Sequence, residues 1–296
     1  MLSVLNSVSQ LGAENALSST QASLQNTLLQ LSTGLKINSG SDDAAGLSIA
    51  AGLGASISAL TQSSQNASNS VGLLQTADGA LSQVTTLLNR AVTLATEAAN
   101  GNLTSAQSTA ADTEFQSILA EITQIGSTTN FNGAPVFSAT ALSTFTSDGT
   151  TAGTTITPTS TGDLSATSLN LQWTAAQVTA EKALPAPDAT APVAATNLDL
   201  STSNDAQIAL TAITAAINAV AATRGTIGAS VNQLTADENV ENTQVTNLTS
   251  AQNNVQNADI GTTVAKMTQY NVLEQTGMAA LSQSNQAQQA VLKLLQ

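Results

Sequence analysis

The feature that most constrains this fold is a seven-residue apolar repeat near both ends of the chain. In the N-terminal part, Leu17, Leu24 and Leu31 are seven residues apart, and Leu28 and Leu35 fall between and after them at spacings of four and three. This spacing places the leucines on one stripe of an α-helix and is typical of a coiled coil. Because one narrow stripe cannot bury itself, the sequence predicts a long helix that needs a partner.

A second long helix is predicted after a short polar interruption. Gly34 and the polar run 38–43 break the first repeat, and Ser41 or Asp42 is a suitable N-cap for a helix that resumes at Ala44. This helix is expected to end at Asn100-Gly101, and a shorter one is predicted over 112–126. Its predicted core positions are Leu60, Val71, Leu74, Leu81 and Leu88.

The C-terminal third repeats this pattern. Its long helix is predicted to place these residues in the core: Ile217, Val220, Val231, Leu234, Val245 and Leu248. Arg224, Glu238 and Glu241 interrupt the stripe, which favours a loose bundle, or partners in a larger assembly, over a tightly zipped dimer. A last helix is expected from about Gly261, with its apolar seam at Val264, Met267, Met278, Leu281, Leu292 and Leu295.

The central segment 138–204 has a different composition, rich in Thr, Ser, Gly and Pro. A hairpin is expected around Asp148-Gly149, close to the β-branched run 154–157, and 179–197 is predicted to be an exposed loop. A short insert returns the chain beside itself, so the flanking helices should pack antiparallel. The predicted fold is mainly α: an elongated antiparallel helical bundle or coiled coil with a small β-hairpin in a central insert.

The amino-acid composition argues against catalysis, metal binding and binding to nucleic acid. The chain has no Cys and no His, so it lacks the commonest metal ligands and general bases, and a His-Glu-x-x-His zinc site is excluded. We therefore expect no enzyme activity, no metal site and no cofactor. Six Lys and Arg against nineteen Asp and Glu give a net charge of −13, which predicts no binding to nucleic acid. No apolar run approaches eighteen residues, so no membrane insertion is expected, and no cleaved secretory signal peptide is apparent.

Two local motifs could suggest sites, but structural roles suit them better. Gly52-Leu-Gly54 lacks the third glycine of a dinucleotide-binding loop, and its position within a helix favours close helix packing. Asp42-Asp43 could be read as paired acid catalysts. Adjacent carboxylates where a helix begins are more often partners of the helix dipole, and no complementary base accompanies them.

The loop between the first two helices carries a family resemblance. The run Leu31-Ser-Thr-Gly-Leu-Lys-Ile-Asn-Ser39, followed by Asp42-Asp-Ala-Ala-Gly-Leu47, resembles the N-terminal signature of bacterial flagellins. Other segments are similar to the same family in the right order: 89–100, 129–133, 163–169, 247–251, Asp259 and 286–295. The resemblance extends over about two thirds of the chain, at both of its ends, and helical heptads alone could not supply the loop motif.

The resemblance implies a structural subunit that polymerises with itself into the extracellular filament used for swimming. It implies an inner-tube domain from arms 1–43 and 257–296, a long-helix domain from 44–137 and 205–256, and the insert 138–204. The apolar seams of both arms would mediate self-assembly, with arms that order on polymerisation. Implied partners are an export chaperone, the filament cap and hook-associated junction proteins, with passage through the flagellar export apparatus and no cleaved signal peptide.

The same resemblance suggests contacts with an innate-immune receptor at Arg90, Leu94 and Glu114. The alternative for the two charged residues is a solvated helix face or a subunit interface. Two other functional classes compete with the filament subunit. The first is a coiled-coil adhesin or a hook-filament junction protein. A junction protein would also assemble through terminal arms, but would form only a limited ring. The second alternative is an enzyme.

Overall fold

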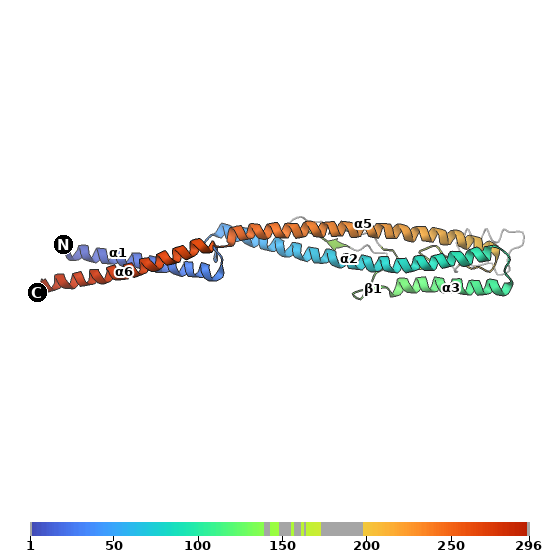
Figure 1. Cartoon of the computed structure of the whole chain (residues 1–296), viewed down its shortest axis with the longest axis horizontal. Helices are drawn as coiled ribbons and strands as arrows, with labels where there is room; N and C mark the ends of the chain where they lie inside the picture. Colours follow the sequence, from blue (N-terminus) through green and yellow to red (C-terminus); the bar gives the residue numbers. More distant parts are fainter. Residues whose placement is uncertain are drawn as a thin grey trace. The chain divides into compact units, whose positions relative to one another are not determined.

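The described residues form five long helices (Figure 1) and two small strand pairs. The computed structural model describes residues 2–138, 143–147, 155–156, 161–162, 164–172 and 198–294. Its internal contacts divide the chain into two compact units. Unit 1 comprises Met1–Ser58 and Val245–Gln296, and unit 2 comprises Ala59–Gln244. The boundaries fall inside helices α2 (Ala44–Ala99) and α5 (Ser203–Gln256), away from the helix ends at which the sequence suggested domain limits.

In unit 1, helices α1 (Leu2–Thr33) and α6 (Ile260–Leu294) lie side by side in antiparallel directions (Figure 1). The amide of Gln10 donates to Asn285 Oδ1 at 3.1 Å, and the amide of Gln21 donates to Glu274 Oε1 at 3.2 Å. Both bonds join exposed side chains. The antiparallel packing predicted for the two arms is therefore confirmed for this helix pair.

The loops that end α1 and α5 pair with each other through their backbones. Gly34 follows α1 with φ of +73°, the left-handed conformation that ends many helices. Beyond it, Lys36 N donates to the carbonyl of Gln256 at 2.7 Å, and Ala258 N donates to the carbonyl of Gly34 at 2.9 Å. These bonds flank an antiparallel bridge between Leu35 and Asn257.

The N-cap of α2 lies one or two residues after the predicted positions, Asp42 or Ser41. Asp43 caps the helix, because its Oδ1 accepts from Gly46 N at 2.9 Å. Asp42 instead organises the loop, with its Oδ2 accepting from the backbone N–H groups of Asn38 and Ser39 at 3.0 and 2.9 Å. These hydrogen bonds stabilise the charged form and lower the pKa of Asp42. Both carboxylates thus have structural roles.

Unit 2 is built on the antiparallel packing of α2 and α5, with α3 (Ser105–Thr128) against them. Helix α3 begins seven residues before its predicted start at Asp112. The reason is a capping box, in which Gln107 Oε1 accepts from Thr104 N at 2.9 Å. The large side chains of this unit that are almost fully buried include Leu74, Leu81, Leu88, Phe115, Leu119, Ile122 and Ile213.

Two short antiparallel strand pairs follow α3. Strands β1 (Asn130–Phe131) and β2 (Ala134–Pro135) flank a turn in which Asn132 and Gly133 have φ of +52° and +80°, as an Asn-Gly hairpin requires. Strand β3 (Thr144–Phe145) pairs with β4 (Thr155–Ile156). The predicted hairpin of the insert is confirmed by β3 and β4. The predicted turn at 148–149, residues 154 and 157 of the β-branched run, and the predicted loop 179–197 lie outside the described residues.

The described parts of the insert differ from the exposed segment that composition suggested. Leu164, Leu171, Leu198 and Leu200 are at most 5% exposed and belong to the core of unit 2. These four leucines lie within an otherwise polar segment, and burying each one removes apolar surface from water. At Gly126 on α3, a Cβ would lie 1.9 Å from the carbonyl oxygen of Leu164, so only glycine allows this close approach.

Helices α2 and α5 each contain an 18-residue window of mean hydropathy 1.5, which by length and composition alone would suit a membrane span. The prediction had counted only uninterrupted apolar runs and missed these Ala-rich stretches. Of these two windows, 17% and 28% are buried within the described structure. In unit 2 the two helices are joined to each other by polar and charged contacts, described below.

Candidate functional site

The predicted self-assembly seam lies on α1, α6 and the loop between α1 and α2. Six of its members are half-buried: Leu17, Leu24, Leu31, Leu35, Met267 and Leu281. Leu28, Val264 and Met278 are 46%, 40% and 49% exposed. The side chain of Leu292 is not among those described, and Leu295 lies outside the described residues. Leu17, Met278 and Leu281 line an open groove of about 520 Å³ whose rim is made of Ser, Asn and Gln side chains.

A second set of exposed apolar side chains on these helices was missed by counting heptads. Val8, Leu11, Leu29, Val272 and Leu273 are between 44% and 65% exposed. They lie outside the predicted apolar seams of α1 and α6.

The pairing of α1 with α6 buries very little. Among the described side chains of these two helices, Thr27 and Thr263 alone are buried, and both are polar. The described side chains of the helix pair therefore present apolar surface on both helices and form no closed apolar core within the single chain.

The predicted core positions of the long helices differ in how deeply they are buried. Six are buried in unit 2: Leu60, Leu74, Leu81, Leu88, Val220 and Leu234. Val71, Ile217 and Val231 are half-buried and pack against the same cluster. Val245 and Leu248 are half-buried and belong to unit 1.

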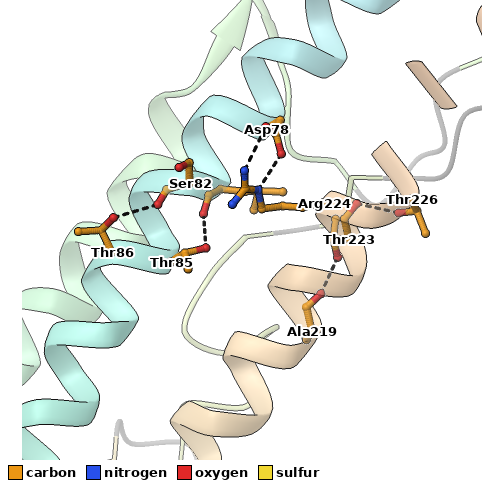
Figure 2. A network of polar contacts seen from close by, with 9 residues as sticks. Asp78, Ser82, Thr85, Thr86, Ala219, Thr223, Arg224 and Thr226 are labelled. Atoms are coloured by element: carbon orange, nitrogen blue, oxygen red, sulfur yellow. Dashed lines mark hydrogen bonds and ion pairs between the residues drawn. The ribbon is translucent and has the colours of Figure 1, made fainter. Parts of the chain in front are cut away.

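The charged residues in the predicted α5 seam have partners across the helix pair. Figure 2 shows Arg224 reaching from α5 to Asp78 on α2, with Nε donating to Oδ1 at 2.7 Å and Nη2 donating to Oδ2 at 3.3 Å. Both side chains are more than a third exposed, so the pair contributes roughly 0.2–1 kcal/mol. Around it, hydroxyls such as those of Thr85 and Thr223 donate to carbonyls of their own helices. Arg224 is thus a register contact between α2 and α5.

Glu241 also has a partner on α2, but it is buried. Its Oε1 lies 2.5 Å from the hydroxyl of Ser63, which also lies 3.2 Å from the carbonyl oxygen of Phe145 on β3. Nothing in the heptad pattern indicated that Ser63 would be buried beside it. A polar pair at facing seam positions, 178 residues apart in the chain, is visible only once the helices are aligned.

The structure pairs Arg90 with Glu114 on the surface, whereas Leu94 is buried. Arg90 on α2 donates from Nε and Nη2 to the two carboxylate oxygens of Glu114 on α3, at 2.6 and 3.0 Å. This bidentate pair lowers the pKa of Glu114, and its side chains are 53% and 45% exposed. Leu94 is 3% exposed and belongs to the core of unit 2. The first two residues are therefore on the surface, and the third is not.

The residues that the structure describes contain no candidate metal site. No group of three or more His, Cys, Asp or Glu side chains in that part of the chain could hold a metal ion. At Gly54, an added Cβ would lie 3.1 Å from the amide nitrogen of Gln252, which donates to the carbonyl of Ala50. The predicted close packing is therefore confirmed at Gly54. It is wrong for Gly52, where a Cβ would meet nothing within 4 Å.

Comparison with known proteins decides the family. The N-terminal helical region of bacterial flagellin matches residues 4–141, and the C-terminal helical region of the same family matches residues 210–295. A flagellin of Halalkalibacterium halodurans is 32% identical over 271 residues, which cover 92% of this chain and 91% of that protein. The chain belongs to the bacterial flagellin family.

Other flagellins also resemble this chain. The flagellin of Listeria monocytogenes is 27% identical over 266 residues, which are 90% of each chain. The crystal structure of Bacillus cereus flagellin is 27% identical and aligns with 64% of this chain and 94% of that one, at a TM-score of 0.45. The family assignment rests on the matched helical regions and on the sequence relatives.

This flagellin is therefore a structural subunit that assembles into the flagellar filament, an extracellular polymer of motile bacteria. The two family matches include both α1 and α6, and they leave residues 142–209 between them. The part of the flagellin that is shared with the family thus contains the helix pair without a buried apolar core.

Proposed function

We propose that α1 and α6 are the polymerising arms of this flagellin, and that both sets of exposed apolar residues are buried between neighbouring subunits in the filament. The observation that supports this is the absence of any buried apolar side chain among those described on the two helices. Fully burying one Leu, Val or Met contributes about 1.5–3 kcal/mol. Several together would offset the cost of ordering the arms, about 1–2 kcal/mol per residue of backbone.

In this proposal, residues 1–43 and 257–296 form the inner-tube domain, and 44–137 with 205–256 form the long-helix domain. The insert 138–204 would lie on the outer side. The inner-tube and long-helix domains carry the apolar seams, and the hydrogen bonds between α1 and α6 are made by Gln, Asn and Glu side chains. We expect the subunit interfaces to be similarly polar at their rims and apolar at their centres.

The proposal extends to export and partners. We infer that the subunit leaves the cell through the flagellar export apparatus without a cleaved signal peptide, bound first by an export chaperone. In the filament it would contact the cap and the hook-associated junction proteins. We further infer that it has no catalytic activity, since the charged side chains described above serve as helix caps and inter-helix pairs.

An innate-immune receptor is a weaker candidate partner. Arg90 and Glu114 are exposed, which supports recognition, but each already satisfies the other in a bidentate pair. Leu94 would have to leave the core to make a contact. The geometry favours a structural role for these residues, in holding α3 against α2.

The experiment that tests the arm proposal is seeded elongation of the purified chain, scored by negative-stain electron microscopy. Val272→Ser on α6 is the test variant, and Val240→Ser on α5 is its control, because each valine is 54% exposed. We expect long filaments from the unaltered chain and the control, and at least tenfold less elongation from Val272→Ser. Equal loss in both variants would contradict an interface centred on the arms. Short rings from the unaltered chain would instead support the junction protein.

A further inference from the structure

A buried polar cluster lies where strand β3 meets α2 and α5 in unit 2. Its members are Ser63 on α2, Thr144 on β3 and Glu241 on α5, which are 1%, 3% and 5% exposed. The Ser63 hydroxyl contacts both Glu241 Oε1 and the carbonyl oxygen of Phe145. A second link joins the hydroxyls of Ser70 and Thr144 at 2.7 Å. The cluster therefore ties β3 to α2 directly, and to α5 through Ser63.

Counting protons in this cluster shows that it suits a neutral acid. A serine hydroxyl has one proton, and its two neighbours here, a carbonyl and an ionised carboxylate, could only accept it. One acceptor would then be left unsatisfied. Glu241 Oε2 is also buried, with no hydrogen-bond partner in the described part of the chain. If Glu241 is protonated, it donates to Ser63 Oγ, Ser63 donates to Phe145 O, and no buried charge is left unpaired.

We propose that Glu241 is a carboxylic acid that holds β3 on α2 and α5 while it is protonated, and that its ionisation releases the strand. The cluster is then a pH-sensitive latch inside a single subunit. It rests on contacts within unit 2 and is independent of how the arms assemble.

The electrostatic surroundings agree with this assignment. Burial raises the pKa of Glu241, the hydrogen bond with Ser63 lowers it, and the carboxylates of Asp237 and Glu238 on the same helix raise it further. The elements that face it supply no cation. Helix α2 has no ionisable side chain from Ala44 to Ala77, and the two residues of β3 are Thr and Phe.

The direction of the pH effect follows from this shift. The pKa of Glu241 is higher in the folded chain than in the unfolded chain, so the folded chain holds the proton more tightly. The stabilisation is therefore complete below the unfolded pKa of a glutamate. It is lost as the pH rises through the folded pKa of Glu241.

The test uses the full-length chain kept monomeric, as wild type, Glu241→Gln and Glu121→Gln. Glu121 is exposed on α3, so its substitution controls for loss of one negative charge. Between pH 5 and pH 8, the melting midpoint of wild type and control should fall relative to Glu241→Gln. A tenfold difference in proton affinity corresponds to a fall of about 3–5 °C over the whole titration, and roughly half of that fall lies above pH 5. Amide exchange in 143–147, corrected for its intrinsic pH dependence, should rise with pH in wild type and not in Glu241→Gln.

Parallel pH profiles for wild type and Glu241→Gln would overturn the proposal. Should Glu241→Gln fail to fold, carbon-13 NMR titration of the glutamate carboxyls in the wild-type chain decides the matter. A carboxyl that titrates well above the ordinary range, and that is missing from the Ser63→Ala spectrum or displaced in it, supports the latch. If all glutamates titrate in the ordinary range, Glu241 is ionised near neutral pH and the latch does not exist.

Discussion

Helices α1 and α6 differ from unit 2 in how much of their apolar surface is covered within one chain. In unit 2, leucines at the seam positions of α2 and α5 are nearly inaccessible, as are aromatic and aliphatic residues of α3. On α1 and α6, seam residues of the same type are half-buried or exposed. Similar heptad patterns therefore serve two purposes. One pattern completes a core, and the other leaves a surface that a neighbouring subunit can complete.

Deleting residues 267–296 should have the largest effect, because it should stop assembly without unfolding unit 2. The deletion removes most of α6, so the apolar stripe of α1 loses its partner, while no residue of unit 2 is touched. We expect seeded filament growth to cease and the melting transition of unit 2 to persist. Electron microscopy and circular dichroism measure the two outcomes. Normal filament yield from the truncated chain would show that α6 is dispensable for assembly.

Matched leucine truncations should give the next largest difference. Leu81 is 2% exposed in unit 2, and Leu29 is 50% exposed on α1. Leu81→Ala should lower the free energy of unfolding of unit 2 by roughly 2–5 kcal/mol, because it opens a cavity. Leu29→Ala should leave the monomer within about 0.5 kcal/mol. Urea denaturation of monomers measures both, and a large loss in Leu29→Ala would mean that α1 is already packed before assembly.

Two glycines of unit 2 allow a finer test of its close packing. Gly126→Ala forces a Cβ against the backbone of Leu164 and should cost roughly 1–3 kcal/mol. Gly79 on α2 has nothing within 4 Å of a Cβ, so Gly79→Ala should stabilise the helix by up to about 1 kcal/mol. Thermal melting of both variants tests whether 164–171 is part of the core. Gains in both variants would place that segment away from α3.

The smallest expected effect concerns the charged contact between α2 and α5. A double-mutant cycle of Asp78→Ala and Arg224→Ala should give a coupling energy of about 0.2–1 kcal/mol that falls with added salt. Urea denaturation of the four proteins measures it. A coupling above 2 kcal/mol would mean that the pair is far less exposed to solvent than its surface area indicates.

Heptad spacing and the loop motif were sufficient to predict the helices and the family, because both are local patterns in the sequence. The start of α2 at Ala44 was predicted correctly. Its N-cap was misplaced because Asp42 and Asp43 can each accept backbone N–H groups, and only the loop geometry selects Asp43. Helix α3 was predicted too short, because the capping box at Thr104 and Gln107 lies before its apolar residues.

The remaining differences depend on contacts between distant parts of the chain. Arg224 and Glu241 were recognised as polar interruptions, but their partners Asp78 and Ser63 are identified only by the alignment of two antiparallel helices. The buried leucines of the insert were hidden by a polar average composition. The exposure of the seam residues on α1 and α6 could not be predicted either, because a heptad pattern identifies an apolar stripe but not what covers it.

The backbone pairing of 34–36 with 256–258 has a consequence for how this chain can change. One added residue in either loop would turn the helix that follows by about 100° and carry its apolar stripe away from its neighbour. A length change in one loop would therefore need a matching change in the other. The central insert is free of this coupling, so natural variation in length is expected to accumulate there, while the two loops keep their lengths together.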